Sequence, residues 1–181
     1  MRLLPAAGRR AVPWKNGGGL TLPVATDPAE AGFDDFHWRV SIAEIGKPGP
    51  FSRFEGVDRA LVVLAGRLRL IFDDRTVVLG PESEPALFPG EAHCVGAPLG
   101  GHSKDLNVMT RRGRASARLD RVASGSIAAQ QGPALFVATA PSTVRGPREA
   151  LRLEMHDAAF LEERFELLLN GAGILIVFSK T

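Results

Sequence analysis

The sequence predicts an all-β protein, and three observations support that prediction. Twenty glycines and thirteen prolines break the chain into short segments. Most of these segments are rich in Val, Leu, Ile and Phe, which favour strands over turns. The one long stretch with helical propensity, residues 157–178, contains Asn170-Gly171, a dipeptide typical of tight hairpins. We therefore expect strands there, with at most a short helical turn before them.

The predicted strands fall into an earlier and a later group along the chain. The earlier strands are 38–45 (WRVSIAEI), 60–66 (ALVVLAG), 67–72 (RLRLIF), 76–80 (TVVLG), 86–95 (ALFPGEAHCV) and 104–109 (KDLNVM). A hairpin through Gly66 is expected between the second and third of these, and residues 73–75 (DDR) form the next turn. After the basic run at 111–114 the pattern restarts with 116–122 (SARLDRV), 133–139 (PALFVAT) and 151–156 (LRLEMH).

This restart predicts two structural parts in one chain. Residues 1–113 are expected to form a first barrel with an N-terminal segment. Residues 114–181 are expected to form a second, smaller half that packs with the first as one compact unit. A chain of 181 residues is long enough to bury such a core without disulfides.

Two of the predicted strands carry polar side chains at every second position. In 38–45 these are Arg39 and Ser41, and in 104–109 they are Asp105 and Asn107. Such a polar face either meets solvent, which is the commoner case, or lines a polar cavity.

Composition excludes several classes of protein. The sequence has no run of eighteen apolar residues that could span a membrane. Residues 1–13 (MRLLPAAGRRAVP) have no apolar run long enough for a secretory signal, so none is expected. The single cysteine, Cys94, fits a reducing compartment, so a cytoplasmic location is expected. A net charge of +2 gives little reason to expect a nucleic-acid partner. The short basic run at 111–114 is interpreted as a turn. A homodimer is a further expectation, because exposed sheet edges can pair with those of a second copy.

Residues 51–70 resemble the first conserved motif of the cupins, in which HxH and then a glutamate precede a V-L-x-G hairpin. Here the glutamate position falls on Arg59, and the histidine positions fall near Ser52 and Phe54. The second cupin motif, P-x-G-x-x-H, is echoed at 88–93 and keeps His93. A catalytic divalent metal needs at least three protein ligands, so neither a metal nor another cofactor is expected.

An arginine in place of the glutamate reverses the charge at this position. A partly buried guanidinium needs a counter-charge. One possibility is an internal ion pair, with Asp58, Glu55 or Asp105 as partner. The other is a bidentate clamp on the carboxylate of a ligand.

A glycine-rich segment near the N-terminus offers a second polar cluster. Residues 12–19 read VPWKNGGG, and three consecutive glycines allow close backbone approach to an anion. The alternative is a simple turn capped by Trp14.

Four blocks in this order resemble the HutD/Ves family of bicupins: WKNGGG (14–19), WRVSIAEI (38–45), GPFSRFEGVDRALVVLAG (49–66) and KDLNVMTRRG (104–113). The resemblance implies a double-stranded β-helix (cupin) fold with two cupin-like barrels and without the usual metal. It also implies a link to bacterial histidine utilisation, with a regulatory or ligand-sensing role and no established catalytic activity.

The leading hypothesis is a binding protein for a small carboxylate of the urocanate or N-formylglutamate class. The predicted ligand-binding residues are Trp14, Lys15, Asn16, Gly17, Arg39, Ser41, Phe51, Ser52, Arg59, His93, Asp105 and Asn107. The alternative is a metal-free acid–base isomerase or hydrolase acting on a small organic acid, with His93 and Asp105 as the reacting pair. No catalytic residue is assigned from the sequence, and a non-enzymatic role is favoured.

Overall fold

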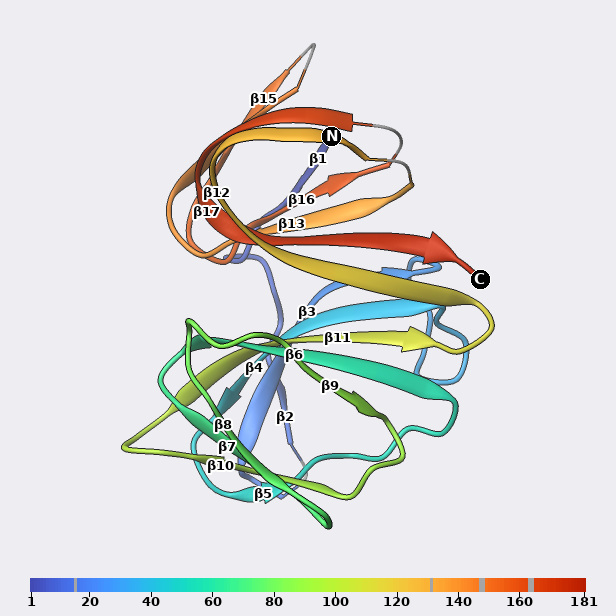
Figure 1. Ribbon diagram of the computed structural model, residues 1–181, viewed down its shortest axis with the longest axis vertical. Helices are drawn as coiled ribbons and strands as arrows, with labels where there is room; N and C mark the ends of the chain where they lie inside the picture. Colours follow the sequence, from blue (N-terminus) through green and yellow to red (C-terminus); the bar gives the residue numbers. More distant parts are fainter. Residues whose placement is uncertain (15, 131, 147–148, 163–164) are drawn as a thin grey trace. The chain divides into compact units, whose positions relative to one another are not determined.

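The computed structural model of the protein describes residues 1–14, 16–130, 132–146, 149–162 and 165–181. Within these ranges the regular elements are all strands, β1 to β17, so the prediction of an all-β protein is confirmed (Figure 1). No helix among the described residues is long and apolar enough to cross a membrane.

The chain divides into two compact units. The first unit is Arg10–Arg114, and the second combines Met1–Arg9 with Ala115–Thr181. The sequence pattern had placed residues 1–113 together. The first nine residues lie with the second unit because their strand, β1 (Arg2–Leu4), pairs with β16 (Ala158–Leu161).

The first unit consists of two antiparallel sheets (Figure 1). The larger sheet runs in the order β2 (Val12–Pro13), β3 (Gly19–Asp27), β4 (Trp38–Ile45), β11 (Ser103–Arg111), β6 (Val57–Ala65) and β9 (Ala86–Pro89). The smaller sheet runs in the order β5 (Gly49–Pro50), β10 (Cys94–Pro98), β7 (Leu68–Phe72) and β8 (Thr76–Leu79). Leu61 and Val63 of the larger sheet share a buried core with Leu68 and Leu70 of the smaller one, so the two sheets face each other.

The predicted hairpin through Gly66 is wrong. β6 pairs with β11 and β9, whereas β7 pairs with β10 and β8, so Gly66 carries the chain from one sheet to the other. The backbone at Gly66 has a φ of 73°, and an added Cβ would lie 2.5 Å from the carbonyl oxygen of His102. Only glycine fits this crossing without strain.

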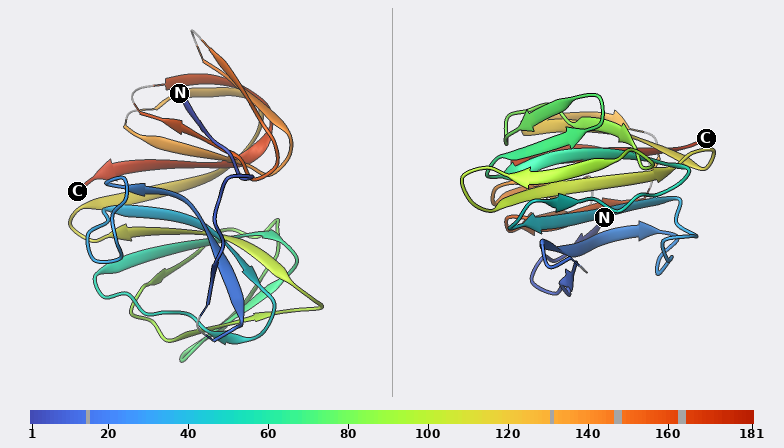
Figure 2. Two further views of the ribbon diagram at one scale, coloured as in Figure 1. Left: turned by 180° about the vertical axis from the view of Figure 1, so that it is seen from behind. Right: turned by 90° about the horizontal axis from the view of Figure 1, so that it is seen from below.

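The second unit is a seven-stranded sheet. Its order is β1, β16, β13 (Ala134–Ala138), β17 (Phe165–Lys180), β14 (Ser142–Arg145) and β15 (Ala150–Leu153), and β12 (Ala115–Gln130) also pairs with β17. Leu167 and Leu169 from one half of β17 enter the same core as Leu175 and Val177 from the other half. The sheet therefore curls around its own core, and the curvature of β12 and β17 is visible in the left view of Figure 2.

The predicted hairpin at Asn170-Gly171 is also wrong. β17 passes through these residues as one strand and pairs with β12 on both sides of them. The register against β12 shifts between Ala123 and Gly125, so the irregularity is a bulge and not a turn. No helical turn precedes β17 among the described residues.

Candidate functional site

A cavity of about 620 Å³ opens in the first unit. It is lined by Val12, Pro13, Trp14, Asn16, Thr21, Phe33, Arg39, Ser41, Ala43, Pro50, Phe51, Ser52, Phe54, Arg59, Asp105, Asn107 and Met109. Most of this wall is apolar, with a few polar groups converging on it. Such a composition is typical of sites for small molecules.

Strand register explains why the polar groups converge. Side chains alternate between the faces of a strand, so residues paired across neighbouring strands share a face. Asn107 of β11 pairs with Ser41 of β4, and Met109 pairs with both Arg39 of β4 and Arg59 of β6. The polar face that the sequence predicted on these strands therefore lines a cavity.

Arg59 is the buried cation of this cavity. Its residue is only 8% exposed, and its guanidinium lies 5.2 Å from the ring centre of Phe51 and 5.0 Å from that of Phe88. Its Nε donates to Asn107 Oδ1 at 3.3 Å and its Nη1 donates to the carbonyl oxygen of Ser52 at 3.4 Å, both long distances for hydrogen bonds. Burial lowers the pKa of Arg59 to about 10, which leaves the side chain charged at neutral pH.

The carboxylates proposed as internal partners of Arg59 do not form ion pairs with it. Asp58 pairs with Arg112 at 2.7 Å, and Glu55 lies 3.8 Å from Arg53. Among the ion pairs of the described residues, none joins Arg59 to Asp105. The guanidinium is therefore buried with electrostatic attraction to Asp105 but without a carboxylate in contact.

Asp105 is the buried acid of the same cavity. It is 1% exposed, and its Oδ2 has no hydrogen-bond partner among the described residues. Burial raises the pKa of Asp105 to about 7, although the charge of Arg59 acts in the opposite direction. The carboxyl group therefore changes its charge near neutral pH.

Aromatic side chains form the apolar wall. The guanidinium carbon of Arg39 lies 4.7 Å from the ring centre of Phe33, which in turn stacks on Phe54 at 5.4 Å. Trp14 meets Phe51 edge to face at 6.0 Å. Burial lowers the pKa of Arg39, and its charge adds to that of Arg59.

The glycine-rich segment forms a turn beside the cavity. Trp14 donates its backbone N–H to Gly19 and its indole N–H to Thr21 Oγ1, while Asn16 Oδ1 accepts from the N–H of Gly18. Trp14 and Asn16 line the cavity, whereas Gly17 is not among the lining residues. Lys15 lies outside the described residues.

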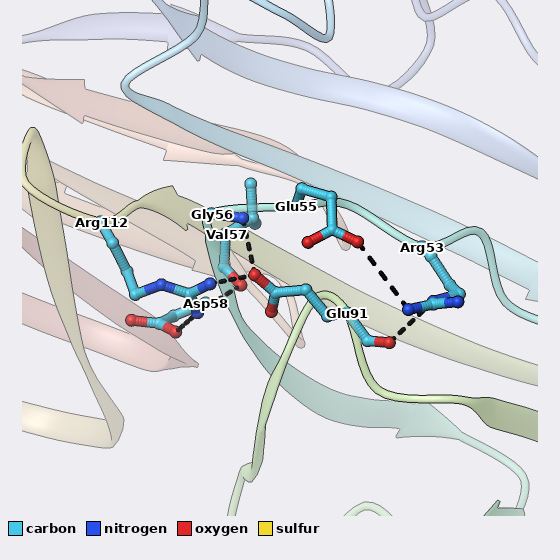
Figure 3. A network of polar contacts seen from close by, with 7 residues as sticks. All are labelled: Arg53, Glu55, Gly56, Val57, Asp58, Glu91 and Arg112. Atoms are coloured by element: carbon cyan, nitrogen blue, oxygen red, sulfur yellow. Dashed lines mark hydrogen bonds and ion pairs between the residues drawn. The ribbon is translucent and has the colours of Figure 1, made fainter.

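A surface network fixes the loop that carries Phe51, Ser52 and Phe54 (Figure 3). Glu91 accepts a hydrogen bond from the N–H of Gly56 at 2.6 Å and forms an ion pair with Arg112, which also contacts Asp58. The N–H of Gly56, together with the Arg112 guanidinium, lowers the pKa of Glu91. Arg53 Nε donates to the backbone carbonyl of Glu91 at 2.8 Å, so the loop is tied to the β9–β10 connection at Arg53 and at Gly56.

His93 lies on the protein surface and does not line the cavity. Its Nδ1 lies 2.9 Å from Asp73 Oδ1, both side chains are largely exposed, and His93 is not among the cavity residues. The pair suggested for acid–base chemistry, His93 with Asp105, is therefore not brought together. Among the described residues, no group of three or more His, Cys, Asp or Glu side chains could hold a metal ion.

The structure thus gathers most of the predicted set around one cavity. These residues are Trp14, Asn16, Arg39, Ser41, Phe51, Ser52, Arg59, Asp105 and Asn107. The predicted ligand-binding set lacked several lining residues, among them Phe33 and Met109. Met109 alternates with Asp105 and Asn107, which could have revealed it, whereas Phe33 lies in a loop without a periodic pattern.

A family model and a curated relative match this chain over nearly its whole length, and a second curated relative matches over part of it. The family model described as HutD matches residues 6–177. An uncharacterised 21.2 kDa protein in the hutC 3' region of Pseudomonas putida is 36% identical over 178 residues, which cover 93% of this chain and 90% of that protein. Protein Ves from Citrobacter koseri is 38% identical over 109 residues, which cover 59% of this chain and 56% of that protein.

Solved structures confirm the fold. HutD from Pseudomonas fluorescens SBW25, in a formate condition, has a TM-score of 0.87 and 28% identity, covering 99% of this chain and 98% of that one. A cupin 2 conserved barrel domain protein from Leptotrichia buccalis and an oxalate decarboxylase from Bacillus subtilis are 7% and 8% identical, with TM-scores of 0.60 and 0.63. The last two show the fold alone, and the predicted cupin and bicupin architecture is confirmed.

Proposed function

The chain belongs to the HutD family of cupins, and we propose that it binds a small carboxylate ligand, without a metal, in the cavity of its first unit. The ligand class that we propose is that of urocanate and N-formylglutamate. The role that we propose is regulatory or sensing, within histidine utilisation.

One observation carries this proposal: Arg59 is buried and charged without a carboxylate in contact. A buried cation without a carboxylate in contact is costly, and the attraction to Asp105 offsets only part of that cost. A ligand carboxylate would supply the missing counter-charge through charge-assisted hydrogen bonds, which are the strongest that a guanidinium makes.

The charge balance of the cavity supports the same choice. Arg39 and Arg59 are cations, and Asp105 is the one acid among the lining residues that the structure describes. Because burial raises the pKa of Asp105 to about 7, the carboxyl group is neutral in a large fraction of the protein molecules at pH 7. An anion entering the cavity then meets a net positive charge.

The aromatic wall supports a ligand with an apolar body. Phe51, Phe54 and Trp14 present rings to the cavity, and Ser41 and Asn107 add hydrogen-bonding groups. The family relationship supports the biological context, because the P. putida relative is named for its place beside hutC.

The first prediction concerns binding to Arg59. Isothermal titration calorimetry with formate, acetate, urocanate and N-formylglutamate should detect at least one ligand. In the Arg59→Met variant its affinity should fall by roughly 10- to 100-fold, the equivalent of a lost hydrogen bond to a charged group of about 1.5–3 kcal/mol.

Arg75→Met is the matched control. Arg75 also lies over a phenylalanine, with its guanidinium carbon 4.5 Å from the ring centre of Phe72, but it is not among the cavity residues. This variant should keep the affinity of the unaltered protein. Equal affinity in the Arg59→Met variant, with an intact melting transition, would remove Arg59 from the site.

Acid–base catalysis is a second candidate because Asp105 has a pKa of about 7, a value suited to a general acid or base. The same ligands should be incubated with the protein and followed by NMR. Binding without conversion favours the sensing role, and conversion that is lost in Asp105→Asn favours an enzyme.

A further inference from the structure

Asp105 carries a buried hydrogen-bond acceptor that no described residue uses. The residue is 1% exposed and lines the cavity, and its Oδ2 has no partner among the described residues. Buried polar atoms in folded proteins are nearly always paired, so an unpaired one at a cavity wall needs an explanation. A group that enters the cavity and donates a hydrogen bond would provide one.

The strand geometry places this acceptor next to Arg59. The guanidinium of Arg59 donates to Asn107, and Asp105 lies two residues along β11 from Asn107 on the same face. Two residues of a strand span roughly 7 Å. A ligand whose carboxylate contacts Arg59 would therefore reach Asp105 with a group several bonds away.

We infer that Asp105 determines the specificity of the cavity, by accepting a hydrogen bond from an N–H or O–H group of a ligand whose carboxylate lies on Arg59. The inference rests on the proposed carboxylate site and narrows its ligands to carboxylates that carry such a donor. Carboxylates without the donor should bind more weakly, because they leave the buried oxygen of Asp105 unpaired.

The charge of Asp105 makes this selection depend on pH. Below about pH 7 the carboxyl group is protonated and tolerates a plain carboxylate nearby. Above that pH the ionised group repels a plain carboxylate but accepts a hydrogen bond from a donor more strongly. The preference for donor-bearing ligands should therefore grow as the pH rises.

The other titratable groups near Asp105 keep one charge state over this range. Arg59 on β6 has a pKa of about 10, and Arg39 on β4 stays cationic. Cys94 on β10, which interacts electrostatically with Arg59, has a pKa raised by burial to about 11 and stays neutral. The pH dependence can thus be assigned to Asp105.

The test compares two probes that differ in one ring atom. 3-(Pyrrol-2-yl)acrylate carries a ring N–H, and 3-(furan-2-yl)acrylate carries a ring oxygen in its place. Affinities measured by calorimetry should favour the pyrrole by at least about tenfold near pH 8.5, and the ratio should shrink to about threefold or less near pH 6.

Three variants test whether the preference for the pyrrole probe depends on Asp105. Asp105→Leu should bring the ratio close to one at both pH values, and Asp105→Asn should make the ratio independent of pH. Asp73→Asn is the control, because Asp73 is an exposed carboxylate paired with His93 outside the cavity. Melting temperatures establish that each variant is folded.

The outcomes separate the two proposals. Equal affinities of the unaltered protein for both probes would mean that a ligand donor does not pair with Asp105, and would overturn the inference while leaving the carboxylate site intact. Probe affinities that do not change in Arg59→Met would overturn the proposed site itself.

Discussion

The side chains of Arg59 and Asp105 face one cavity, and burial disfavours the charged form of each. Their mutual attraction offsets part of this cost, but they are not in contact as an ion pair. Replacing buried charged groups by apolar ones is often neutral or stabilising in proteins. The presence of two buried charged groups is therefore better explained by ligand binding than by a contribution to the stability of the fold.

The pKa of Asp105 leads to a prediction about stability. Its folded-state pKa of about 7 lies above the ordinary value of 3.8, so the folded protein keeps a proton that the unfolded chain has released between these values. The free energy of unfolding should therefore fall as pH rises through this window, by on the order of 4 kcal/mol.

Asp105→Asn removes the titrating group and should flatten this dependence. Urea unfolding of the unaltered protein and of the variant, at several pH values from about 4 to about 8, measures it. Above about pH 7 the variant should be the more stable of the two. Parallel pH profiles would show that Asp105 titrates normally in the folded protein.

At the scale of elements, the aromatic wall depends on close packing between β10 and the loop after β5. A Cβ added at Gly96 would lie 2.6 Å from the ring of Phe51. Gly96→Ala should push Phe51 toward the cavity, destabilise the protein by roughly 1–3 kcal/mol and weaken ligand binding.

Gly80→Ala provides the comparison for this prediction. No atom lies within 4 Å of a Cβ at Gly80, so its melting temperature and ligand affinity should stay close to those of the unaltered protein. Equal stability of the two alanine variants would show that Phe51 moves away without cost.

The elements also show what the sequence could and could not predict. Alternation placed Arg39, Ser41, Asp105 and Asn107 on shared strand faces, because side-chain direction in a strand is a local property. Strand pairing is not local. Gly66 marks a change of direction, but it does not say which sheet the next strand joins, and the predicted hairpin was therefore wrong.

The same limit applies to Asn170-Gly171 and to the loops around the cavity. A turn-forming dipeptide within a long strand can form a bulge when the partner strand continues past it, as β12 does. Phe33 enters the cavity wall from a loop, and Glu91 and Arg112 fix another loop from a distance in sequence (Figure 3). Such contacts join residues that are distant in sequence, so local sequence patterns do not predict them.

At the scale of the whole molecule, the family match extends over residues 6–177, while the proposed site lies within the first unit alone. Residues from six strands (β2, β3, β4, β5, β6 and β11) and their loops surround the cavity, which makes the first unit the part of the chain where ligand binding is proposed. The second unit has an extensive core of its own, and no function is proposed for it.

The most direct test of the central claim is a crystal structure of the protein soaked in a carboxylate, with formate as the smallest probe. The account predicts a carboxylate whose oxygens contact the guanidinium of Arg59 inside the cavity. A carboxylate bound only elsewhere, or an Arg59 side chain turned out of the cavity into solvent, would contradict it.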